Sequence, residues 1–284
     1  MQRTRKPQRT TRREILRGAV GFGAGAFVAG GWGASSVVAA RQDASPVTAP
    51  EALGYLSLRL RELNSPDLIP EIDEIVISEF VPVVQELPGY RGYLLGDVFE
   101  NPAQNLAITV LESDMDVAAF NEAAETFVRG VDPQYAPETP LEVEGDLFIA
   151  ATSVAPSAAT PVAGTPVAAS ATPSVAPAAG GGFVVARLYT GETGSDPVAA
   201  VPGFISDLLP EIAVLPGFGG YLWFFTGDGF GTVSLFGDSA AATASTITEL
   251  GYVRGNVEGQ TGASPTIISA SIVFADLPIL TPSS

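Results

Sequence analysis

Residues 87–94, LPGYRGYL, recur at residues 215–222 as LPGFGGYL, an offset of 128 positions. Three further pairs of segments match at this spacing or close to it: Leu58-Arg59-Leu60 with Ala186-Arg187-Leu188, Pro82 with Pro210, and FVRG at 127–130 with YVRG at 252–255. One register held over about 35 residues indicates an internal duplication. The last pair is offset by 125 positions, which predicts a shorter hairpin in the second copy.

The hydrophobic pattern of each copy predicts the order strand, helix, strand, strand, helix, strand. In residues 55–61 leucines alternate with polar side chains, as in a strand covered on one side, and we expect the leucines to face the helices. Pro82 is expected to kink or end the first helix, and Ser113 with Asp116 to begin the second. The first copy is predicted to have strands at 55–61, 93–98, 106–111 and 141–149, and helices at 72–83 and 117–131. The second is predicted to have strands at 183–189, 221–226, 231–236 and 266–274, and helices at 198–209 and 240–252.

This element order is that of a ferredoxin-like βαββαβ unit, an antiparallel four-stranded sheet with both helices on one face. The other face needs a cover, and the simplest cover is the sheet of the second copy. The predicted fold class is therefore α+β, with two ferredoxin-like units forming a pseudo-dimeric α/β barrel within one chain. The protein is expected to be a monomer with internal domain pairing.

The N-terminal segment predicts export. Residues 11–17 read TRREILR and precede an uncharged stretch, residues 18–40, in which 14 of 23 residues are Gly or Ala. Arg12 and Arg13 with this stretch, which ends in small residues at Ala40, resemble a twin-arginine signal. An uncleaved membrane anchor is the alternative, but so many glycines favour a cleaved signal with no stable membrane span left afterwards. The expected location is secreted or on the exterior of the cell envelope.

The remaining boundaries follow from composition. Residues 151–182 contain no charge and only Ala, Pro, Thr, Ser, Val and Gly, which is typical of a disordered linker. The predicted organisation is a signal peptide at 1–40, a tether at 41–52, a first unit at 53–150, this linker, a second unit at 183–278 and a tail at 279–284.

The residue types present exclude several partners and chemistries. Beyond residue 40 the chain has 30 acidic and seven basic residues, so it should repel nucleic acids. It has no His and no Cys, and its single lysine is Lys6. An axial haem histidine, the usual ligands of transition metals and Ser–His, Cys–His or lysine nucleophile systems are therefore missing. We predict no cofactor and no metal, and exclude a haem peroxidase.

The repeated Pro-Gly-aromatic-x-Gly-Tyr turn, the element order and the aromatic-Val-Arg end of the second helix resemble the dimeric α/β-barrel superfamily. Within it the units are similar to domains of the antibiotic-biosynthesis-monooxygenase type, here in tandem. The resemblance implies a barrel formed by two units. It also implies that an active member would be a cofactor-independent monooxygenase, binding polycyclic aromatic substrates in an apolar pocket between sheet and helices.

The candidate ligand-binding residues are Arg59, Tyr93, Arg187, Tyr221 and Trp223. Arg59 and Arg187 occupy equivalent positions, opposite in parity to the leucines, and are expected to point towards the inter-sheet side. Each forms either a structural ion pair, with Glu112, Glu142 and Glu144 as candidate partners in the first unit, or a contact with a ligand anion. Tyr93 and Tyr221 are also equivalent, and Trp223 shares a strand face with Tyr221. These aromatic residues either line a pocket or belong to the core.

Three functions stay open at this point. The leading prediction is an exported, cofactor-free protein that binds a small apolar or aromatic molecule. The alternatives are a cofactor-independent monooxygenase and a structural or interaction module with filled cores. A cavity beside Tyr221 and Trp223 that holds a buried polar group favours the oxygenase, an apolar cavity favours binding, and no cavity favours the third function.

Overall fold

A computed structural model of the chain describes residues 51–135, 138–152, 182–190, 197–227, 229–257 and 264–277. The predicted signal peptide with Arg12, Arg13 and Ala40 lies outside these residues, as do nearly all of the tether and linker and the whole tail. Below, "first repeat" and "second repeat" denote the sequence repeats at 53–150 and 183–278. No helix in the described part of the chain is long and apolar enough to cross a membrane.

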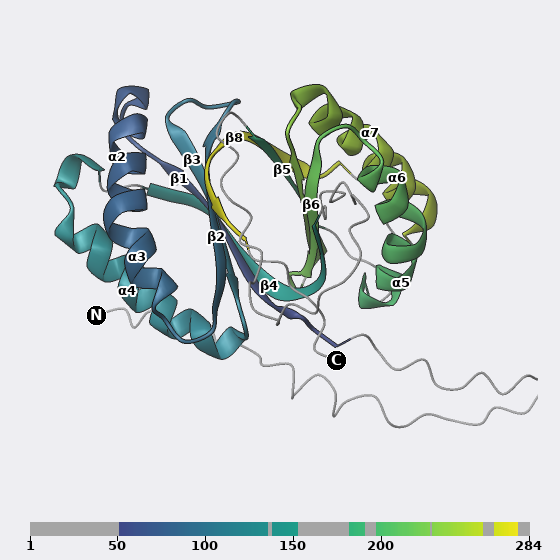
Figure 1. Ribbon diagram of the computed structural model, residues 1–284, viewed down its shortest axis with the longest axis horizontal. Coiled ribbons are helices and arrows are strands. Elements are labelled where there is room, and N and C mark those ends of the chain that lie inside the picture. The colour runs from purple at the N-terminus through teal and green to yellow at the C-terminus, as the bar shows by residue number, and fades with distance from the viewer. Residues whose placement is uncertain are drawn as a thin grey trace, which may run out of the picture. The chain divides into compact units, whose positions relative to one another are not determined.

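The described strands form a closed, antiparallel barrel of the α+β class (Figure 1). The strands are β1 (Gly54–Glu62), β2 (Tyr90–Val98), β3 (Gln104–Leu111), β4 (Glu138–Thr152), β5 (Gly182–Thr190), β6 (Phe218–Phe225), β7 (Gly229–Phe236) and β8 (Thr266–Asp276). Their order around the barrel is β1-β3-β2-β8-β5-β7-β6-β4. The edge strands of the two repeats are hydrogen-bonded to each other, β2 to β8 and β4 to β6, so the sheets join at both edges.

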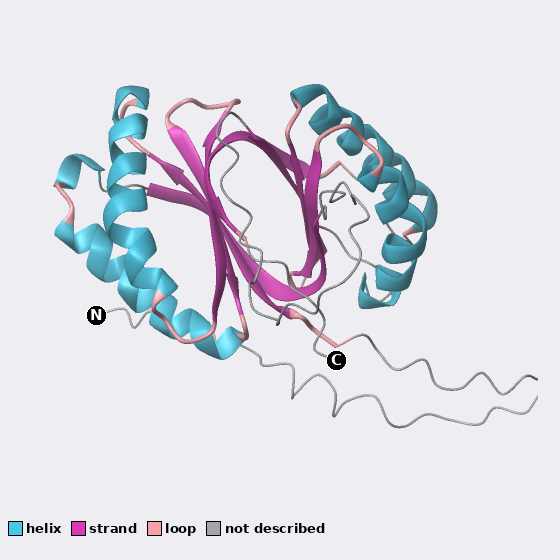
Figure 2. Cartoon of the chain, in the orientation of Figure 1, coloured by secondary structure: helices cyan, strands magenta, loops and turns pink. Residues whose placement is uncertain are grey.

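The helices lie outside this barrel, those of the first repeat on one side and those of the second on the other (Figure 2). The first repeat has α2 (Ile69–Ile75), α3 (Val81–Gln85) and α4 (Val117–Gly130). The second repeat has α5 (Val201–Gly203), α6 (Leu209–Ala213) and α7 (Ser239–Asn256). Short 3-10 segments stand at Pro66–Leu68, Asp114–Asp116, Pro133–Tyr135 and Pro197–Ala200.

The first helix of each repeat continues past its proline. A five-residue π-helical segment, Val76–Phe80 or Phe204–Leu208, precedes Pro82 or Pro210. Each proline then takes the second position of the next α-helical segment, where its missing N–H is tolerated. The prediction that Pro82 kinks or ends the helix is therefore only partly right, because the irregularity lies before the proline and the helix runs on to Gln85.

The leucines of the first strand face the inside of the barrel and not the helices. Leu56 and Leu58 are fully buried there, in a cluster of mostly aliphatic side chains drawn from both repeats. The expected orientation was wrong for a physical reason. Closing the barrel buries both faces of each sheet, so alternation identifies the two faces without saying which one meets the helices.

The repeated turn and the second helix start follow the predictions. Gly89 and Gly217 adopt positive φ angles of 75° and 69°, a conformation that favours glycine. Ser113 and Asp116 form a capping box, in which the backbone N–H of Ser113 donates to Asp116 Oδ2 over 3.1 Å. The hairpin between β6 and β7 is shorter than that between β2 and β3, as the change of offset predicted.

Candidate functional site

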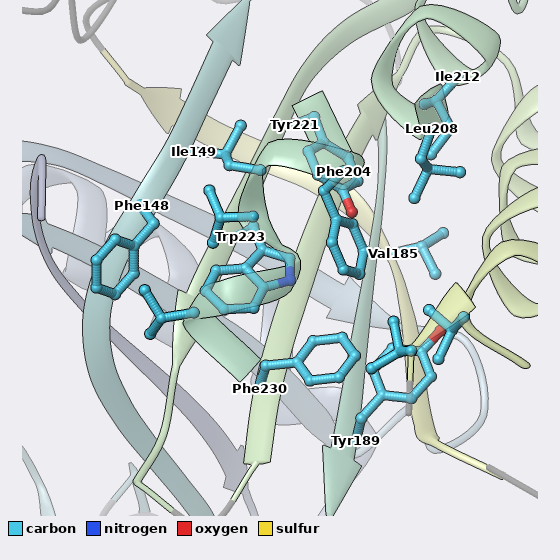
Figure 3. Close-up of a cluster of buried hydrophobic side chains, with 14 of the residues drawn as sticks. Phe148, Ile149, Val185, Tyr189, Phe204, Leu208, Ile212, Tyr221, Trp223 and Phe230 are labelled. Carbon is cyan, nitrogen blue, oxygen red and sulfur yellow. The ribbon is translucent and has the colours of Figure 1, made fainter. Parts of the chain in front are cut away.

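The space between sheet and helices is filled by aromatic side chains in the second repeat (Figure 3). Trp223 stacks on Phe230 with ring centroids 5.5 Å apart, and Phe230 stacks on Tyr189 at 4.6 Å. Tyr221 and Trp223 are both 0% exposed. Burial and then the charge of Glu249 raise the pKa of Tyr221 well above its usual value, so its hydroxyl stays protonated.

Arg187 lies in the same space between the sheet and α7 of the second repeat, within a network of buried polar side chains. Its guanidinium forms a salt bridge with Glu249 Oε2 of α7 over 3.1 Å, and both side chains are 0% exposed. Arg187 also donates to Ser234, Ser245 and Thr246. Glu249 accepts further hydrogen bonds from Thr232 over 2.6 Å and from Tyr189 over 3.1 Å. The buried charges therefore neutralise each other, which favours the structural ion pair for Arg187 over a contact with a ligand anion.

Arg59, the equivalent residue of the first repeat, has a different carboxylate partner. Its guanidinium lies 2.7 Å from Glu142 Oε1 and 3.5 Å from Glu144 Oε1, both on β4. It also donates to Asn121 of α4, and it packs over the ring of Phe120. Two of the predicted partners are thus confirmed, whereas Glu112 pairs with Arg91 at the surface.

Both arginines contact the outer helices, so the prediction that they point to the inter-sheet side was wrong. Arg59 reaches α4 and Arg187 reaches α7, on the helix-facing side of their strands. This follows from the inverted orientation of the leucines, because residues one apart on a strand point to opposite faces.

A pocket of about 460 Å³ lies beside Arg59 in the first repeat, between β1, β4 and α4. Its lining residues are Arg59, Arg61, Asn121, Ala124, Glu125, Val128, Arg129 and Glu142. Arg61 is 8% exposed and forms no hydrogen bond or salt bridge with any described residue. Arg59 is neutralised by Glu142, so Arg61 is a nearly buried positive charge that faces open space.

The repeat alignment explains why the first repeat has a pocket at this position. Strands β3 and β7 match at an offset of 125 over their whole length, and so do the N-caps of the second helices, Ser113 and Asp238. At this offset Glu249 corresponds to Ala124, which lines the pocket. At the offset of 128, Tyr189 corresponds to Arg61. The first repeat therefore lacks the buried carboxylate of the second and carries an additional cation.

Further polar side chains lie buried near this pocket. Tyr93 Oη, Asp97 Oδ1 and Asn105 Oδ1 are buried and have no hydrogen-bond partner in the part of the chain that the structure describes. Burial raises the pKa of Tyr93, although the charge of Arg61 opposes that shift, so Tyr93 can donate a hydrogen bond but is not ionised at neutral pH. A cavity of about 10 Å³, lined by Arg61 and Asn105 among others, has room for about one water molecule.

Asp73 of α2 and Asp97 of β2 face each other in the first repeat. Burial, followed by a hydrogen bond with Asp97 and the charge of Asp97, raises the pKa of Asp73 to about 8. Asn105 donates to Asp73 Oδ1 over 3.2 Å. At neutral pH Asp73 is therefore mostly protonated.

Two other pockets lie at the surface. One of about 390 Å³ lies where the repeats meet and is lined by Phe99, Phe183, Ile247 and Ile267 among others. One of about 370 Å³ lies between α3 and α4 and is mostly apolar. None of the pockets described here is lined by Tyr93, Tyr221 or Trp223, so around Tyr221 and Trp223 the criterion set from sequence favours a filled core. The ligand-binding role of these residues stays a prediction. The described residues contain no cluster of three or more His, Cys, Asp or Glu side chains that could hold a metal ion.

Comparison with known proteins identifies the fold. The sequence matches no protein-family model and no curated protein. A solved structure named "putative monooxygenase", from Fusobacterium nucleatum subsp. nucleatum ATCC 25586, is similar with a TM-score of 0.57 and 10% identity, covering 80% of this chain and 95% of that chain. At this identity the likeness shows the fold alone, and it agrees with the expected α+β barrel.

Two further solved structures are less similar. A "putative monooxygenase" from Lactobacillus acidophilus NCFM has a TM-score of 0.48 and 10% identity, covering 79% of this chain and 96% of that chain. An anthrone oxidase-like protein has a TM-score of 0.49 and 16% identity, covering 79% of this chain and 93% of that chain.

Proposed function

We propose that this chain is an exported small-molecule-binding protein whose site is the pocket between β1, β4 and α4 of the first repeat. In this proposal two ferredoxin-like units of the antibiotic-biosynthesis-monooxygenase type form a pseudo-dimeric barrel. The first unit binds the ligand, and the second, with its filled core, is structural. The protein works as a monomer and needs no cofactor.

One observation carries the proposal: Arg61 is 8% exposed, lies at the wall of a pocket of about 460 Å³ and has no carboxylate partner among the described residues. Burying an unpaired charge is costly, so a fold normally places a partner beside it. In the second repeat the buried carboxylate of Glu249 pairs with Arg187, the equivalent of Arg59, and accepts a hydrogen bond from Tyr189, the equivalent of Arg61. In the first repeat the space is left open, and its volume falls within the usual range of ligand pockets.

The lining gives the ligand both a polar and an apolar contact. Ala124, Val128 and the aliphatic part of Arg61 offer surface to an aliphatic or aromatic body. The lining is more polar than the apolar pocket expected from the family resemblance. A small organic molecule with one polar end fits it better than a polycyclic hydrocarbon does.

Native mass spectrometry of the purified protein tests the proposal. The wild-type chain should carry a small molecule, or should gain one from a metabolite extract. Ala124→Phe, which fills the pocket without adding charge, should abolish this binding. Ala119→Phe, on the other side of α4 at the apolar surface pocket, serves as the control and should retain it. Equal binding by wild type and Ala124→Phe would locate the ligand elsewhere.

A cofactor-independent monooxygenase is the second candidate. It is favoured by the buried polar atoms of Tyr93 and Asn105, which have no hydrogen-bond partner among the described residues. Asn105 lines the small cavity that also borders Arg61, and such a group can orient a substrate. The name of the Fusobacterium nucleatum structure points to the same activity in that protein. Oxygen uptake that depends on the bound molecule, and that is lost in Tyr93→Phe, would support it. Binding without oxygen uptake would favour the binding protein.

The proposed route of export is tested separately. Replacing both Arg12 and Arg13 with Lys should leave the precursor inside the cell, because the twin-arginine route requires the arginine pair. Unchanged secretion of the double variant would contradict this route but not the binding site.

A further inference from the structure

We propose that the ligand is an organic monocarboxylate, and that its carboxylate pairs with Arg61 in the place that the Glu249 carboxylate occupies in the second repeat. This inference rests on the proposed function, because it names the class of ligand for the same pocket. It is carried by the comparison of the two repeats within one molecule.

In both repeats the equivalent arginine, Arg59 or Arg187, contacts equivalent positions of the second helix. In the second repeat Arg187 contacts both Thr246 and Glu249 of α7. In the first repeat Arg59 contacts Asn121, the residue equivalent to Thr246. The helices are thus docked in the same register, and the position of the Glu249 side chain maps onto the pocket at Ala124.

The charges select a carboxylate. In the second repeat one arginine meets one buried carboxylate, and Tyr189 donates its hydroxyl to that same carboxylate. In the first repeat the tyrosine is replaced by Arg61 and the carboxylate is missing. A ligand carboxylate at Ala124 would face Arg61 as the Glu249 carboxylate faces Tyr189. A planar guanidinium binds a carboxylate through two parallel hydrogen bonds, which gives both affinity and orientation.

The charges around the pocket favour a ligand with one negative charge over a ligand with two. Glu125 and Glu142 also line the pocket, and Glu142 is already paired with Arg59. Arg129 lies at the rim and donates to the backbone of its own helix at Glu125. Among the described residues of the pocket, Arg61 is the nearly buried cation without a carboxylate partner, so a dianion such as a phosphate monoester would bring excess negative charge towards two carboxylates.

Isothermal titration calorimetry with three probes of one shape tests the inference on the purified full chain. The probes are benzoate, the uncharged benzamide and the dianionic phenyl phosphate. Benzoate should bind at least about tenfold more tightly than either of the others, since a charge-assisted hydrogen bond is worth this much or more. Failure of benzoate to bind at about 10 mM, or equal binding of benzamide or phenyl phosphate, would overturn the proposal.

Two variants test the pairing of Arg61 with the ligand carboxylate: one removes the cation, and the other supplies a carboxylate from the protein. Arg61→Gln should weaken benzoate binding about 10- to 100-fold. Ala124→Glu installs the carboxylate of the second repeat, so it should abolish benzoate binding while the melting temperature stays equal or rises. The matched control is Arg91→Gln, at a surface pair with 45% and 61% of the two side chains exposed, and it should bind benzoate like wild type. Unchanged affinity in either Arg61→Gln or Ala124→Glu would also overturn the proposal.

The results separate this inference from the proposed function. If a neutral molecule copurifies with the protein and is lost in Ala124→Phe, the pocket is the site and only the carboxylate is wrong. If neither benzoate nor any copurifying molecule depends on Ala124, both proposals fail.

Discussion

At the scale of single residues, Gly89 shows why the repeated Pro-Gly turn contains glycine. Its φ of 75° is strained for other residues, and a Cβ there would lie 2.3 Å from the carboxylate of Asp116. That carboxylate closes the capping box of the second helix, so a side chain at position 89 would disturb the turn and the cap together. Gly89→Ala should lower the free energy of unfolding by about 1–3 kcal/mol, measured by urea denaturation.

Gly130→Ala is the matched control for this substitution. Gly130 ends α4, has no positive φ, and a Cβ there would meet nothing within 4 Å. Alanine should be neutral there or stabilise the helix by up to about 1 kcal/mol. If both variants lost the same stability, the turn geometry would not be the reason for glycine at position 89.

Also at this scale, the Asp73–Asp97 pair predicts a pH dependence of stability. The pKa of Asp73 is raised to about 8 in the folded protein from an ordinary value of 3.8, so the folded state binds more protons than the unfolded state between these values. The free energy of unfolding should therefore fall as the pH rises from about 4 to about 8. Asp73→Asn should flatten this fall, observed as melting temperature against pH. Glu74→Gln, at the exposed neighbouring position, should keep the wild-type profile.

At the scale of elements, α7 is held to its sheet by the buried Arg187–Glu249 pair. Glu249→Ala leaves the Arg187 charge buried without a carboxylate and should cost about 3–5 kcal/mol of unfolding free energy. Glu112→Ala breaks only the exposed pair with Arg91 and should cost less than about 1 kcal/mol. Thermal and urea denaturation of the two variants compares these costs. A Glu249→Ala protein as stable as wild type would mean that apolar packing alone holds the helix.

At the scale of the whole molecule, the barrel depends on both repeats. Strands β2 and β4 lie at the edges of the first sheet and find their second partners in β8 and β6. A first repeat expressed alone, as residues 51–152, would expose two strand edges and the aliphatic face around Leu56 and Leu58. It should dimerise or aggregate in light scattering, whereas the full chain should be a monomer. A soluble, monomeric first repeat would show that the sheet needs no partner.

The duplication made much of this architecture predictable from sequence. The strand and helix order, the Pro-Gly turn, the cap at Ser113 and Asp116 and the pairing of Arg59 with Glu142 all depend on local pattern or on neighbouring strands. The residue inventory also excludes histidine and cysteine as ligands or nucleophiles, because a chain without His or Cys cannot supply those side chains in any fold. Such inferences need no knowledge of where distant segments meet.

Only the tertiary structure decided which face of each strand meets the helices and where, among the described residues, a nearly buried arginine lies beside open space without a carboxylate partner. Alternation in β1 is equally consistent with leucines facing in or out, and closure of the barrel, which buries both faces, settles the choice. Glu249 lies 62 residues from Arg187, so nothing local marks it as the partner. The repeat alignment could have paired Ala124 with Glu249, but the loss of a carboxylate identifies a site only once packing shows the space beside Arg61 to be open. That space depends on how side chains from three separate elements pack together, which local sequence does not encode.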